Sequence, residues 1–329
     1  MLFSYTNTEK RDFMRKSGIF LAISSLPGSF GIGTLGQGAF DFINFLEKSG
    51  QKLWQVLPIG PTAYGDSPYQ SPSAFAGNPY FIDLGLLMKK GLLSWDESNV
   101  GWENDSVNYG DLYERRFDLL RTAFSRFKNQ IPRDYDDFKK QQDFWLSDYA
   151  LFMTLKEKNH GAAWQTWPNE ERNYIRMDKE AMKRVYKEQL EFWCFIQYEF
   201  FSQWKEMKRY AYEKGIGIIG DMPIYTASDS ADVWANPELF LTDENFNPLV
   251  VAGCPPDSFA KTGQLWGNPI YNWEEMRRRE YHWWIKRFSN ALLLFDYIRL
   301  DHFRGFESFY AVPYGDCTAE HGIALRNRW

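Results

Sequence analysis

Short apolar segments alternate along this chain with segments of helical periodicity, and this alternation constrains the fold more than any other feature. Four segments are apolar enough for strands, at residues 17–25, 52–59, 215–221 and 293–301. The clearest helical patterns cover residues 37–49, 179–213 and 274–290. Gly50 and Gly215 end the first two of these helices. Strands that alternate with helices predict an α/β fold with a parallel sheet.

The number of strands leaves two architectures open. A β/α barrel needs eight strands, whereas only four core strands can be counted, and the 329-residue chain ends soon after Asp301. The chain is therefore either a smaller open sheet or the front half of a barrel. Residues 84–214 are mostly helical in pattern and predict an inserted subdomain. Two stretches rich in Gly, Pro and Asn, residues 60–80 and about 226–272, predict long loops.

Composition excludes several classes of function. The formal net charge of −5 predicts no bulk attraction to nucleic acid or to an anionic membrane. No apolar run approaches the roughly 18 residues that a membrane span needs, and the N-terminal residues lack the apolar core of a signal peptide. Three scattered cysteines and four histidines without ligand spacing predict neither disulfides nor a metal site. We expect a cytoplasmic protein without nucleic-acid or membrane partners.

The glycine-rich segment GIGTLG at residues 31–36 lies between a predicted strand and a predicted helix, as a dinucleotide-binding fingerprint does. Two details oppose that interpretation. Pro27 and Gly28 lengthen the turn before the motif, and the second strand has no acidic residue at its end to bind a ribose. The alternative is a glycine-rich turn that shapes the loop after the first strand.

Charged side chains gather at the ends of two predicted strands. Arg299 and Asp301 are two residues apart, so their side chains leave the strand on the same face. Both lie at the carboxyl end, where parallel β/α folds place their chemistry, and Asp221 ends another apolar strand. An Asp kept ionised by an arginine is suited to attack an anomeric carbon. The alternative is a structural ion pair. His302 could donate to a substrate hydroxyl or be purely structural.

Aromatic residues make up 18% of the chain, which fits either an aromatic core or the stacking of rings on sugars. Two segments, YGDSPYQSPSAFAGNP and GQLWGNP, place aromatic residues among small polar ones. Tyr64, Tyr69 and Trp266 could form platforms there, with hydrogen bonds from Asp66, Ser67, Gln70 and Gln264. Alternatively, these rings are buried anchors of long loops.

Five long motifs occur in order between about Arg15 and about Gly322: SSLPGSFGIGTLG, WQVLPIGPTAYGDSPYQSPSAFAGNPYFIDL, GIIGDMPIYTASDSADVWANPELF, VAGCPPDSFAKTGQLWGNPIYNW and RLDHFRGFESFYAVPYGD. Together they resemble the amylomaltases, the 4-alpha-glucanotransferases or disproportionating enzymes related to the alpha-amylase clan. The resemblance implies a (β/α)8 barrel with helical insertions. It also implies the transfer of alpha-1,4-glucan segments between malto-oligosaccharides by a retaining mechanism, with no organic cofactor.

The resemblance also assigns roles to individual residues. It implies that Asp301 is the nucleophile and that Arg299 supports it. The positions implied to bind glucan are Tyr64, Ser67, Tyr69, Asp221, Gln264, Trp266 and His302.

One part of the family pattern is absent from this sequence. The family's acid/base Glu lies in an A-E-D-L-G-like motif on the strand after that of Asp301, and a third carboxylate next to a His comes later. Neither motif occurs here, and the acids after Asp301 are Glu307, Asp316 and Glu320. The tail IALRNRW also lacks the family's Trp-Lys-Gly-Pro-Gly run. We therefore expect a C-terminally truncated chain that is inactive by itself.

These observations predict four regions: an extension at 1–14 with Met14 as an alternative start, two β/α units with a substrate loop at 15–83, the helical insertion at 84–214, and two further strands with active-site loops at 215–329. A half-barrel leaves strand edges uncovered, so poor solubility or dependence on a partner is expected. A non-catalytic glucan-binding product and an alpha-glucan hydrolase stay as alternative functions.

Overall fold

The computed structural model describes residues 15–327 apart from residue 64, residue 100 and residues 103–104. The predicted extension at residues 1–14, including Met14, therefore lies outside the described residues, and so does Tyr64.

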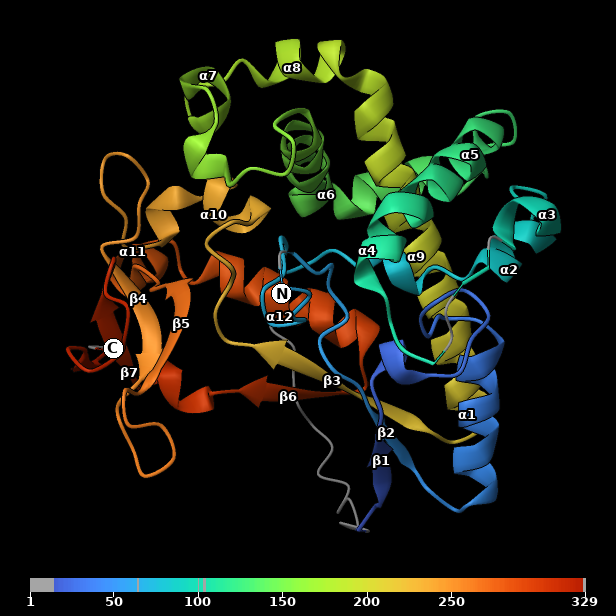
Figure 1. The fold of residues 1–329 in the computed structure, drawn as a ribbon, viewed down its shortest axis with the longest axis horizontal. Coiled ribbons are helices and arrows are strands. Elements are labelled where there is room, and N and C mark those ends of the chain that lie inside the picture. Colours follow the sequence, from blue (N-terminus) through green and yellow to red (C-terminus); the bar gives the residue numbers. More distant parts are fainter. Residues whose placement is uncertain (1–14, 64, 100, 103–104, 328–329) are drawn as a thin grey trace, which may run out of the picture.

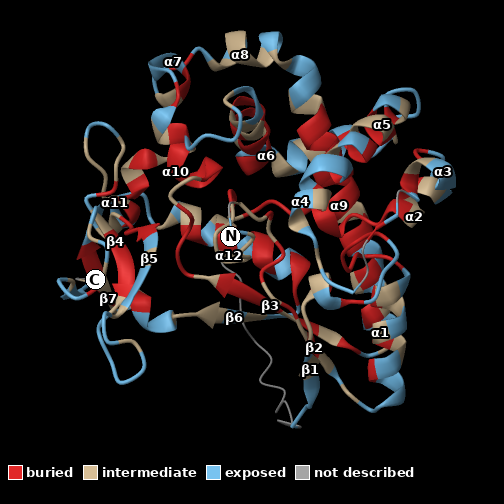
Figure 2. Cartoon of the chain, in the orientation of Figure 1, coloured by how far each residue is buried: buried red, intermediate tan, exposed pale blue. Residues whose placement is uncertain are grey.

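The four predicted strands form one parallel sheet (Figure 1). They are β1 (Gly18–Phe20), β2 (Leu53–Gln55), β3 (Gly217–Pro223) and β6 (Tyr297–Asp301), and they lie side by side in chain order. Strand β3 is mostly buried, whereas the two edge strands β1 and β6 keep exposed residues (Figure 2). Because all four strands are parallel, their carboxyl ends meet at one edge of the sheet.

Helices connect these strands, as predicted. Helix α1 (Gln37–Lys48) joins β1 to β2, and the long connection from β2 to β3 lies above the sheet in Figure 1. Its elements are η2 (Pro79–Phe81), α2 (Leu84–Lys89), α3 (Trp95–Ser98), α4 (Tyr109–Asp111), η3 (Leu112–Arg116), α5 (Phe117–Phe127), α6 (Tyr135–Lys158), η4 (Trp164–Thr166), α7 (Asn169–Arg172), α8 (Lys179–Val185) and α9 (Lys187–Glu213). The short turn η1 (Ile23–Ser25) follows β1.

The single helix predicted over residues 179–213 is wrong in one respect, because it breaks at Tyr186. This residue has φ −106° and ψ 26°, outside the helical region, and separates α8 from α9. Val185 and Tyr186 are both weaker helix formers than the Lys and Glu residues around them, so the break falls where helix propensity is lowest.

Helix α9 holds the loop that follows β2. The Gln197 side chain accepts from the backbone N–H of Gly77 at 2.8 Å and donates to its carbonyl at 3.0 Å. Two turns further on, Gln203 accepts from the N–H of Asp83 at 2.7 Å. These amides satisfy buried backbone groups of a loop that has no sheet partner, so the helical insertion fixes the course of the loop.

The loop predicted over residues 226–272 is wrong, because it contains regular structure. It includes α10 (Ala231–Ala235), η5 (Pro237–Leu239), β4 (Val250–Cys254) and β5 (Gln264–Pro269). With β7 (Ser308–Pro313) and β8 (Ile323–Arg326) these strands form an antiparallel sheet in the order β5-β4-β7-β8. Gly253 lets β5 approach, since a Cβ there would lie 2.4 Å from the Gln264 carbonyl oxygen. Figure 1 places this second sheet beyond the carboxyl end of β6.

The predicted strand 293–301 and helix 274–290 have shifted boundaries. Two helices, α11 (Trp273–Arg278) and α12 (His282–Leu294), take the place of one, and the leucines at 292–294 end α12 rather than begin β6. Leucine is a good helix former, and an apolar run alone does not separate a buried helix end from a strand. The turn η6 (Phe303–Phe306) then leads from β6 into β7.

The structure favours a turn at the glycine-rich segment 31–36. A Cβ on Gly36, the residue that precedes α1, would lie 2.0 Å from a carboxyl oxygen of Asp83. That carboxyl also accepts from the Thr34 hydroxyl at 2.6 Å. A carboxylate at the start of α1 stands where a dinucleotide would need to place a phosphate.

Most of the aromatic excess belongs to the core. Trp54, Trp164, Trp204 and Trp234 are all fully buried, so the aromatic-core interpretation holds for these rings. Within the part of the chain that the structure describes, no helix is both long enough and apolar enough to cross a membrane.

Candidate active site

The strand-end charges predicted from the sequence lie next to one another. In the register of β3 with β6, Asp221 is opposite Arg299 and Pro223 is opposite Asp301. Arg299 Nη1 donates to both carboxyl oxygens of Asp221, at 2.7 and 2.8 Å, and its Nη2 donates to Asp301 Oδ1 at 2.7 Å. One guanidinium therefore joins two carboxylates at the carboxyl ends of neighbouring strands.

Burial separates the two carboxylates. Asp221 is only 5% exposed, whereas the side chain of Asp301 is 37% exposed. Burial raises the pKa of Asp221, and the hydrogen bonds from Tyr69 and Arg299 oppose that rise. The hydrogen bond to Asp221 is the main cause that raises the pKa of Arg299, so the guanidinium stays charged. Asp221 is thus an internal partner, and Asp301 is the carboxylate that a ligand can reach.

Tyr69 links the loop after β2 to this pair. Its hydroxyl donates to Asp221 Oδ2 at 2.9 Å. Burial, helped by the Asp221 carboxylate, raises the pKa of Tyr69 to about 12, so the phenol remains a donor near neutral pH. Ser67 stabilises the turn before it, since its Oγ accepts from the Tyr69 N–H at 3.3 Å.

The other predicted loop residues have different surroundings. Gln70 Nε2 donates to the Trp266 carbonyl at 3.1 Å and to Asn268 Oδ1 at 3.3 Å, so it joins the loop to β5. Asp66 lies in a positive-φ backbone, and burial raises its pKa. Burial also raises the pKa values of Tyr80 and Tyr109, and the charge of Asp66 adds to that rise. Asp66 therefore interacts electrostatically with those two tyrosines.

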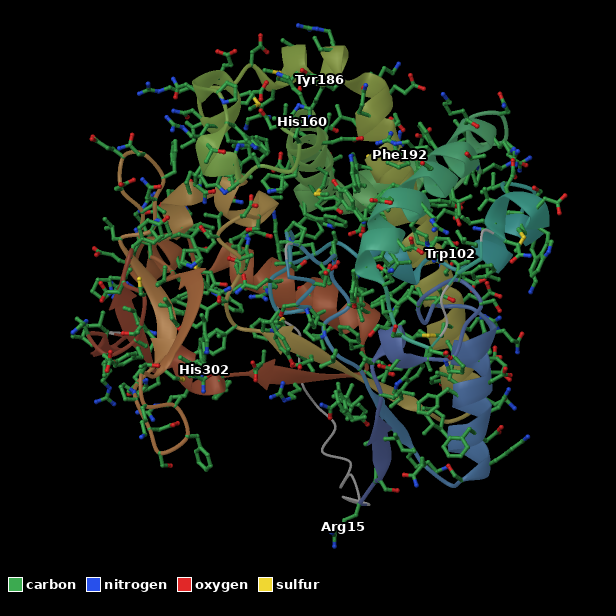
Figure 3. All side chains as sticks on the ribbon, in the orientation of Figure 1. Arg15, Trp102, His160, Tyr186, Phe192 and His302 are labelled. Carbon is green, nitrogen blue, oxygen red and sulfur yellow. The ribbon has the colours of Figure 1, made fainter. Side chains whose placement is uncertain are left out.

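An aromatic group stands beside Asp301. The Trp266 ring on β5 meets the His302 ring edge-to-face, with centroids 4.9 Å apart and an interplanar angle of 87°. Trp266 Nε1 donates to Gln264 Oε1 at 3.1 Å, and both residues lie on a strand rather than in the predicted loop. Figure 3 shows His302 at the end of β6, facing the second sheet.

His302 has an unusual backbone for its residue type. Its φ of 51° is in the left-handed region, which directs the chain from β6 into η6. Such a conformation is costly for a non-glycine residue. Burial lowers the pKa of His302, so near neutral pH its ring is uncharged and can donate one hydrogen bond and accept another.

Sequence reasoning missed three residues of this site. The Tyr225 ring lies 6.3 Å from that of Trp266 and 6.4 Å from that of His302. Asn268 accepts from Gln70 and donates to the Thr226 carbonyl at 2.8 Å. Arg287 on α12 donates to the carbonyls of Pro223 and Ile224 at the end of β3. Tyr225 could have been found from its place just after a strand that ends in an acid. Asn268 and Arg287 could not, because their contacts are with residues distant in sequence.

The arrangement supplies an exposed carboxylate, neutral donors and aromatic faces. Asp301 Oδ1 is held by Arg299, and Oδ2 makes no hydrogen bond among the described residues. This leaves one oxygen free to approach an electrophilic carbon or a hydroxyl. Among the residues that the structure describes, no three His, Cys, Asp or Glu side chains converge to hold a metal ion.

Comparison with known proteins identifies the family. The profile of the glycoside hydrolase 77 family, described as 4-alpha-glucanotransferase, matches residues 21–328. The chain belongs to this family. A 4-alpha-glucanotransferase of Clostridium butyricum is 50% identical over 304 residues, which cover 91% of this chain and 62% of that protein. One of Streptococcus pneumoniae is 47% identical over 316 residues, 94% of this chain and 62% of that protein.

A solved structure of the 4-alpha-glucanotransferase type agrees with this assignment. An amylomaltase from Streptococcus agalactiae in complex with acarbose superposes with a TM-score of 0.91 at 41% identity, over 95% of this chain and 64% of that chain. The predicted family is thus confirmed. This chain spans about 62% of the length of the curated glycoside hydrolase 77 relatives named above.

Proposed function

We propose that this protein works as a 4-alpha-glucanotransferase that moves alpha-1,4-glucan segments between malto-oligosaccharides, with Asp301 as the nucleophile. The observation that carries the proposal is the Arg299-bridged pair of carboxylates, in which Asp221 is buried and Asp301 is exposed. Membership of the glycoside hydrolase 77 family supports it.

This geometry supports the following mechanism for the proposed reaction. The free oxygen of Asp301 attacks the anomeric carbon of the donor sugar, the glycosidic C–O bond breaks, and the leaving oxygen takes a proton from a second carboxyl. A hydroxyl of an acceptor glucan then attacks the same anomeric carbon, the bond between that carbon and Asp301 breaks and releases the carboxylate, and the hydroxyl proton passes to the second carboxyl, so the original configuration is restored. Arg299 fixes the direction of the Asp301 carboxylate, since it donates to Oδ1.

Neither Asp221 nor the acids that follow Asp301 suit the role of proton donor in this mechanism. Both oxygens of Asp221 accept from Arg299, which opposes its protonation. The acids after Asp301 have local partners: Glu307 pairs with Arg326 at 2.5 Å, Asp316 with His321 at 3.7 Å, and Glu320 accepts from Thr318 at 3.0 Å. We therefore infer that the acid/base carboxyl lies outside this sequence and that these 329 residues alone do not complete a transfer cycle.

The same reasoning extends to the fold and the substrate. We interpret the parallel sheet β1-β2-β3-β6 as the first four strands of a (β/α)8 barrel, because parallel strands in chain order are the start of that architecture.

The aromatic group of Trp266 and His302 would stack on glucosyl rings, while Tyr69 and Gln264 would form hydrogen bonds with sugar hydroxyls. The roles of Tyr64, Asp66, Ser67 and Gln70 in glucan binding stay predictions, as does the cytoplasmic location.

A donor with a good leaving group tests the proposal on this chain as it exists. Alpha-maltosyl fluoride needs no proton on its leaving group, and azide can attack the ester without a general base. We expect slow formation of alpha-maltosyl azide, absent with Asp301→Asn. Azide of the beta configuration would contradict the retaining mechanism. Binding of maltose without any azide product would favour a non-catalytic glucan-binding protein.

Release of maltose in place of azide would favour the hydrolase alternative, because only the acceptor differs between hydrolysis and transfer. The matched control is Asp316→Asn, which removes a carboxylate in the chain segment that follows Asp301 and should not change the rate.

A further inference from the structure

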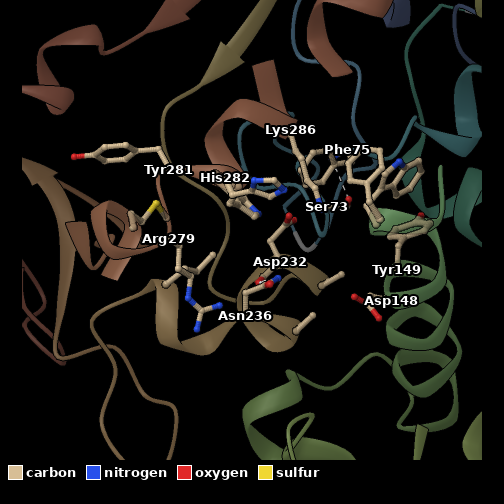
Figure 4. Close-up of a pocket in the computed structure, with 17 residues that line it drawn as sticks. Ser73, Phe75, Asp148, Tyr149, Asp232, Asn236, Arg279, Tyr281, His282 and Lys286 are labelled. Atoms are coloured by element: carbon tan, nitrogen blue, oxygen red, sulfur yellow. Dashed lines mark hydrogen bonds between the residues drawn. The ribbon is translucent and has the colours of Figure 1, made fainter. Parts of the chain in front are cut away.

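Helix α10, which follows β3 in the chain, holds the loop after β2 by two hydrogen bonds. The Ala231 N–H donates to the Pro72 carbonyl at 2.9 Å, and Asp232 Oδ2 accepts from the Ala74 N–H at 2.7 Å. Figure 4 shows the Asp232 carboxyl pointing toward this loop at Ser73. Asp232 is only 5% exposed, so water competes little for its hydrogen bond and the bond is strong.

Arg287 on α12 holds the point at which the chain leaves β3. Its guanidinium donates to the carbonyls of Pro223 and Ile224, the last residue of β3 and the residue after it. Arg287 is buried, and its guanidinium lies over the rings of Trp283 and Trp284, 5.3 and 5.0 Å from their centroids. Attraction between a cation and an aromatic face adds to the two hydrogen bonds, so this side chain is fixed in place.

Asp232 and Arg287 also influence each other. Burial raises the pKa of Asp232 to about 6, and the Ala74 N–H and the charge of Arg287 oppose that rise. A hydrogen bond between Asp232 and Trp283 opposes it as well. Asp232 therefore interacts with α12 on one side and binds the loop on the other.

A small cavity of about 80 Å³ lies between the loop and the end of β3. Its walls include Tyr69 and Ala74 from the loop, Asp221 from β3, and Arg287. Side chains that face a cavity lack packing contacts on that side, so packing alone does not fix the distance from the loop to the strand. Nevertheless the Tyr69 hydroxyl lies 2.9 Å from Asp221 Oδ2. A hydrogen bond of this length requires that both segments be held.

We propose that Asp232 and Arg287 are positioning residues that together hold the Tyr69 hydroxyl against Asp221. Asp232 fixes the loop at Ala74, on one side of the small cavity. Arg287 fixes the end of β3 on the other side.

The contact they maintain is connected to the nucleophile of the proposed reaction, because Arg299 donates to both Asp221 and Asp301. A displaced Tyr69 leaves Asp221 with one donor fewer and changes the direction in which Arg299 is held. The effect on the reaction rests on the proposed function, whereas the effect on Tyr69 does not.

The first test observes Tyr69 directly, by 19F NMR of the chain with 3-fluorotyrosine at position 69. Asp232→Leu keeps the size of the side chain but has no acceptor for the Ala74 N–H. We expect the resonance to move from its parent position toward that of the urea-unfolded chain. Arg287→Met should act in the same direction, since it removes the donors to both carbonyls. Asp232→Asn keeps an oxygen acceptor and should leave the resonance in place.

The second test measures the rate at which alpha-maltosyl fluoride and azide form alpha-maltosyl azide. Asp232→Leu and Arg287→Met should each lower this rate about tenfold, because small misplacements of reacting groups are costly. The double variant should be no slower than the slower single one, since both act through one contact. Asp232→Asn should stay within about twofold of the parent chain. The matched control is Leu120→Ala, which opens a gap in the fully buried part of α5 and should also stay within about twofold.

An unchanged resonance in Asp232→Leu would overturn the proposal, as would equal effects of Asp232→Asn and Asp232→Leu or a shift of the same size in Leu120→Ala. Additive rate losses in the double variant would overturn it too. Asp232→Ala replaces Asp232→Leu if that variant does not fold. A resonance that moves as expected in a chain that forms no glycosyl azide would support the positioning role while contradicting the proposed function.

Discussion

Arg299 donates hydrogen bonds to Asp221 and to Asp301 at the same time, and the two carboxylates have different environments. Asp221 is buried and receives three hydrogen bonds from Arg299 and Tyr69, whereas Asp301 receives one and remains accessible. Both carboxylates are therefore ion-paired with Arg299, and the catalytic role of Asp301 stays a prediction.

Arg299→Ala is expected to destabilise the fold, because it leaves the buried Asp221 carboxylate without its cation. Removal of one partner of a buried pair costs about 3–5 kcal/mol, and the 45% exposure of the Arg299 side chain reduces the expected loss to about 2 kcal/mol. Urea unfolding of the parent chain and of the variant measures this loss of unfolding free energy. Arg209→Ala, which removes an arginine paired with Glu213 at the surface, should cost less than about 1 kcal/mol. Equal losses in the two variants would contradict this account.

Asp232 should make stability depend on pH. Burial raises its pKa from 3.8 to about 6, so the folded state holds a proton that the unfolded state has released. Its contribution is complete below pH 3.8 and is lost as pH rises through about 6. Compared with Asp232→Asn, the parent chain should lose about 3 kcal/mol of unfolding free energy between these values. The prediction would be contradicted if the unfolding free energy of the parent chain, relative to that of Asp232→Asn, stayed constant or grew as the pH rises.

At the scale of elements, helix α9 fixes the loop that carries Tyr69. Gln197→Ala leaves the buried N–H and carbonyl of Gly77 unpaired, which should cost about 2–3 kcal/mol and speed amide exchange in the loop after β2. Hydrogen exchange with mass spectrometry checks this. Gln130→Ala removes an exposed amide and serves as the control. Exchange that is unchanged in Gln197→Ala would exclude this role of α9.

The sequence predicts local elements well and non-local ones poorly. Helix α1 and strands β1, β2, β3 and β6 follow from periodicity, because each carries its own apolar pattern. Strands β4 and β5 do not, since they contain Gly253 and Gly267 and are stabilised by pairing, β5 with β4 and β4 with β7 far along the chain. The break at Tyr186, which was not predicted, and the later end of α12 follow instead from local helix propensity.

The candidate site, like the fold, was predictable from the sequence only in its local features. The common face of Arg299 and Asp301 follows from the two-residue period of a strand. The bond from Arg299 to Asp221 depends on the register of β3 with β6, which the sequence does not specify, and the parts played by Tyr225, Asn268 and Arg287 depend on tertiary contacts. Residues that act through distant partners carry no local pattern to detect.

At the scale of the whole molecule, the edge strands and α12 are among the elements that carry exposed apolar side chains. Phe20 and Tyr297 are exposed on β1 and β6, and Leu293 on α12 is 71% exposed. Unpaired strand edges beside apolar side chains favour association. We expect sedimentation to detect concentration-dependent oligomers, reduced by Leu293→Glu. A monodisperse monomer that melts in one cooperative calorimetric transition would contradict the expectation.

The central claim is that Asp301 is the nucleophile and that its acid/base partner lies outside these residues. Mass spectrometry of the chain after incubation with alpha-maltosyl fluoride tests both parts together. The account predicts a maltosyl ester on the peptide that contains Asp301, long-lived because no described carboxyl activates an acceptor, and absent in Asp301→Asn. A maltosyl group on Asp221 or Glu307, or turnover of maltotriose by this chain without added nucleophile, would contradict it.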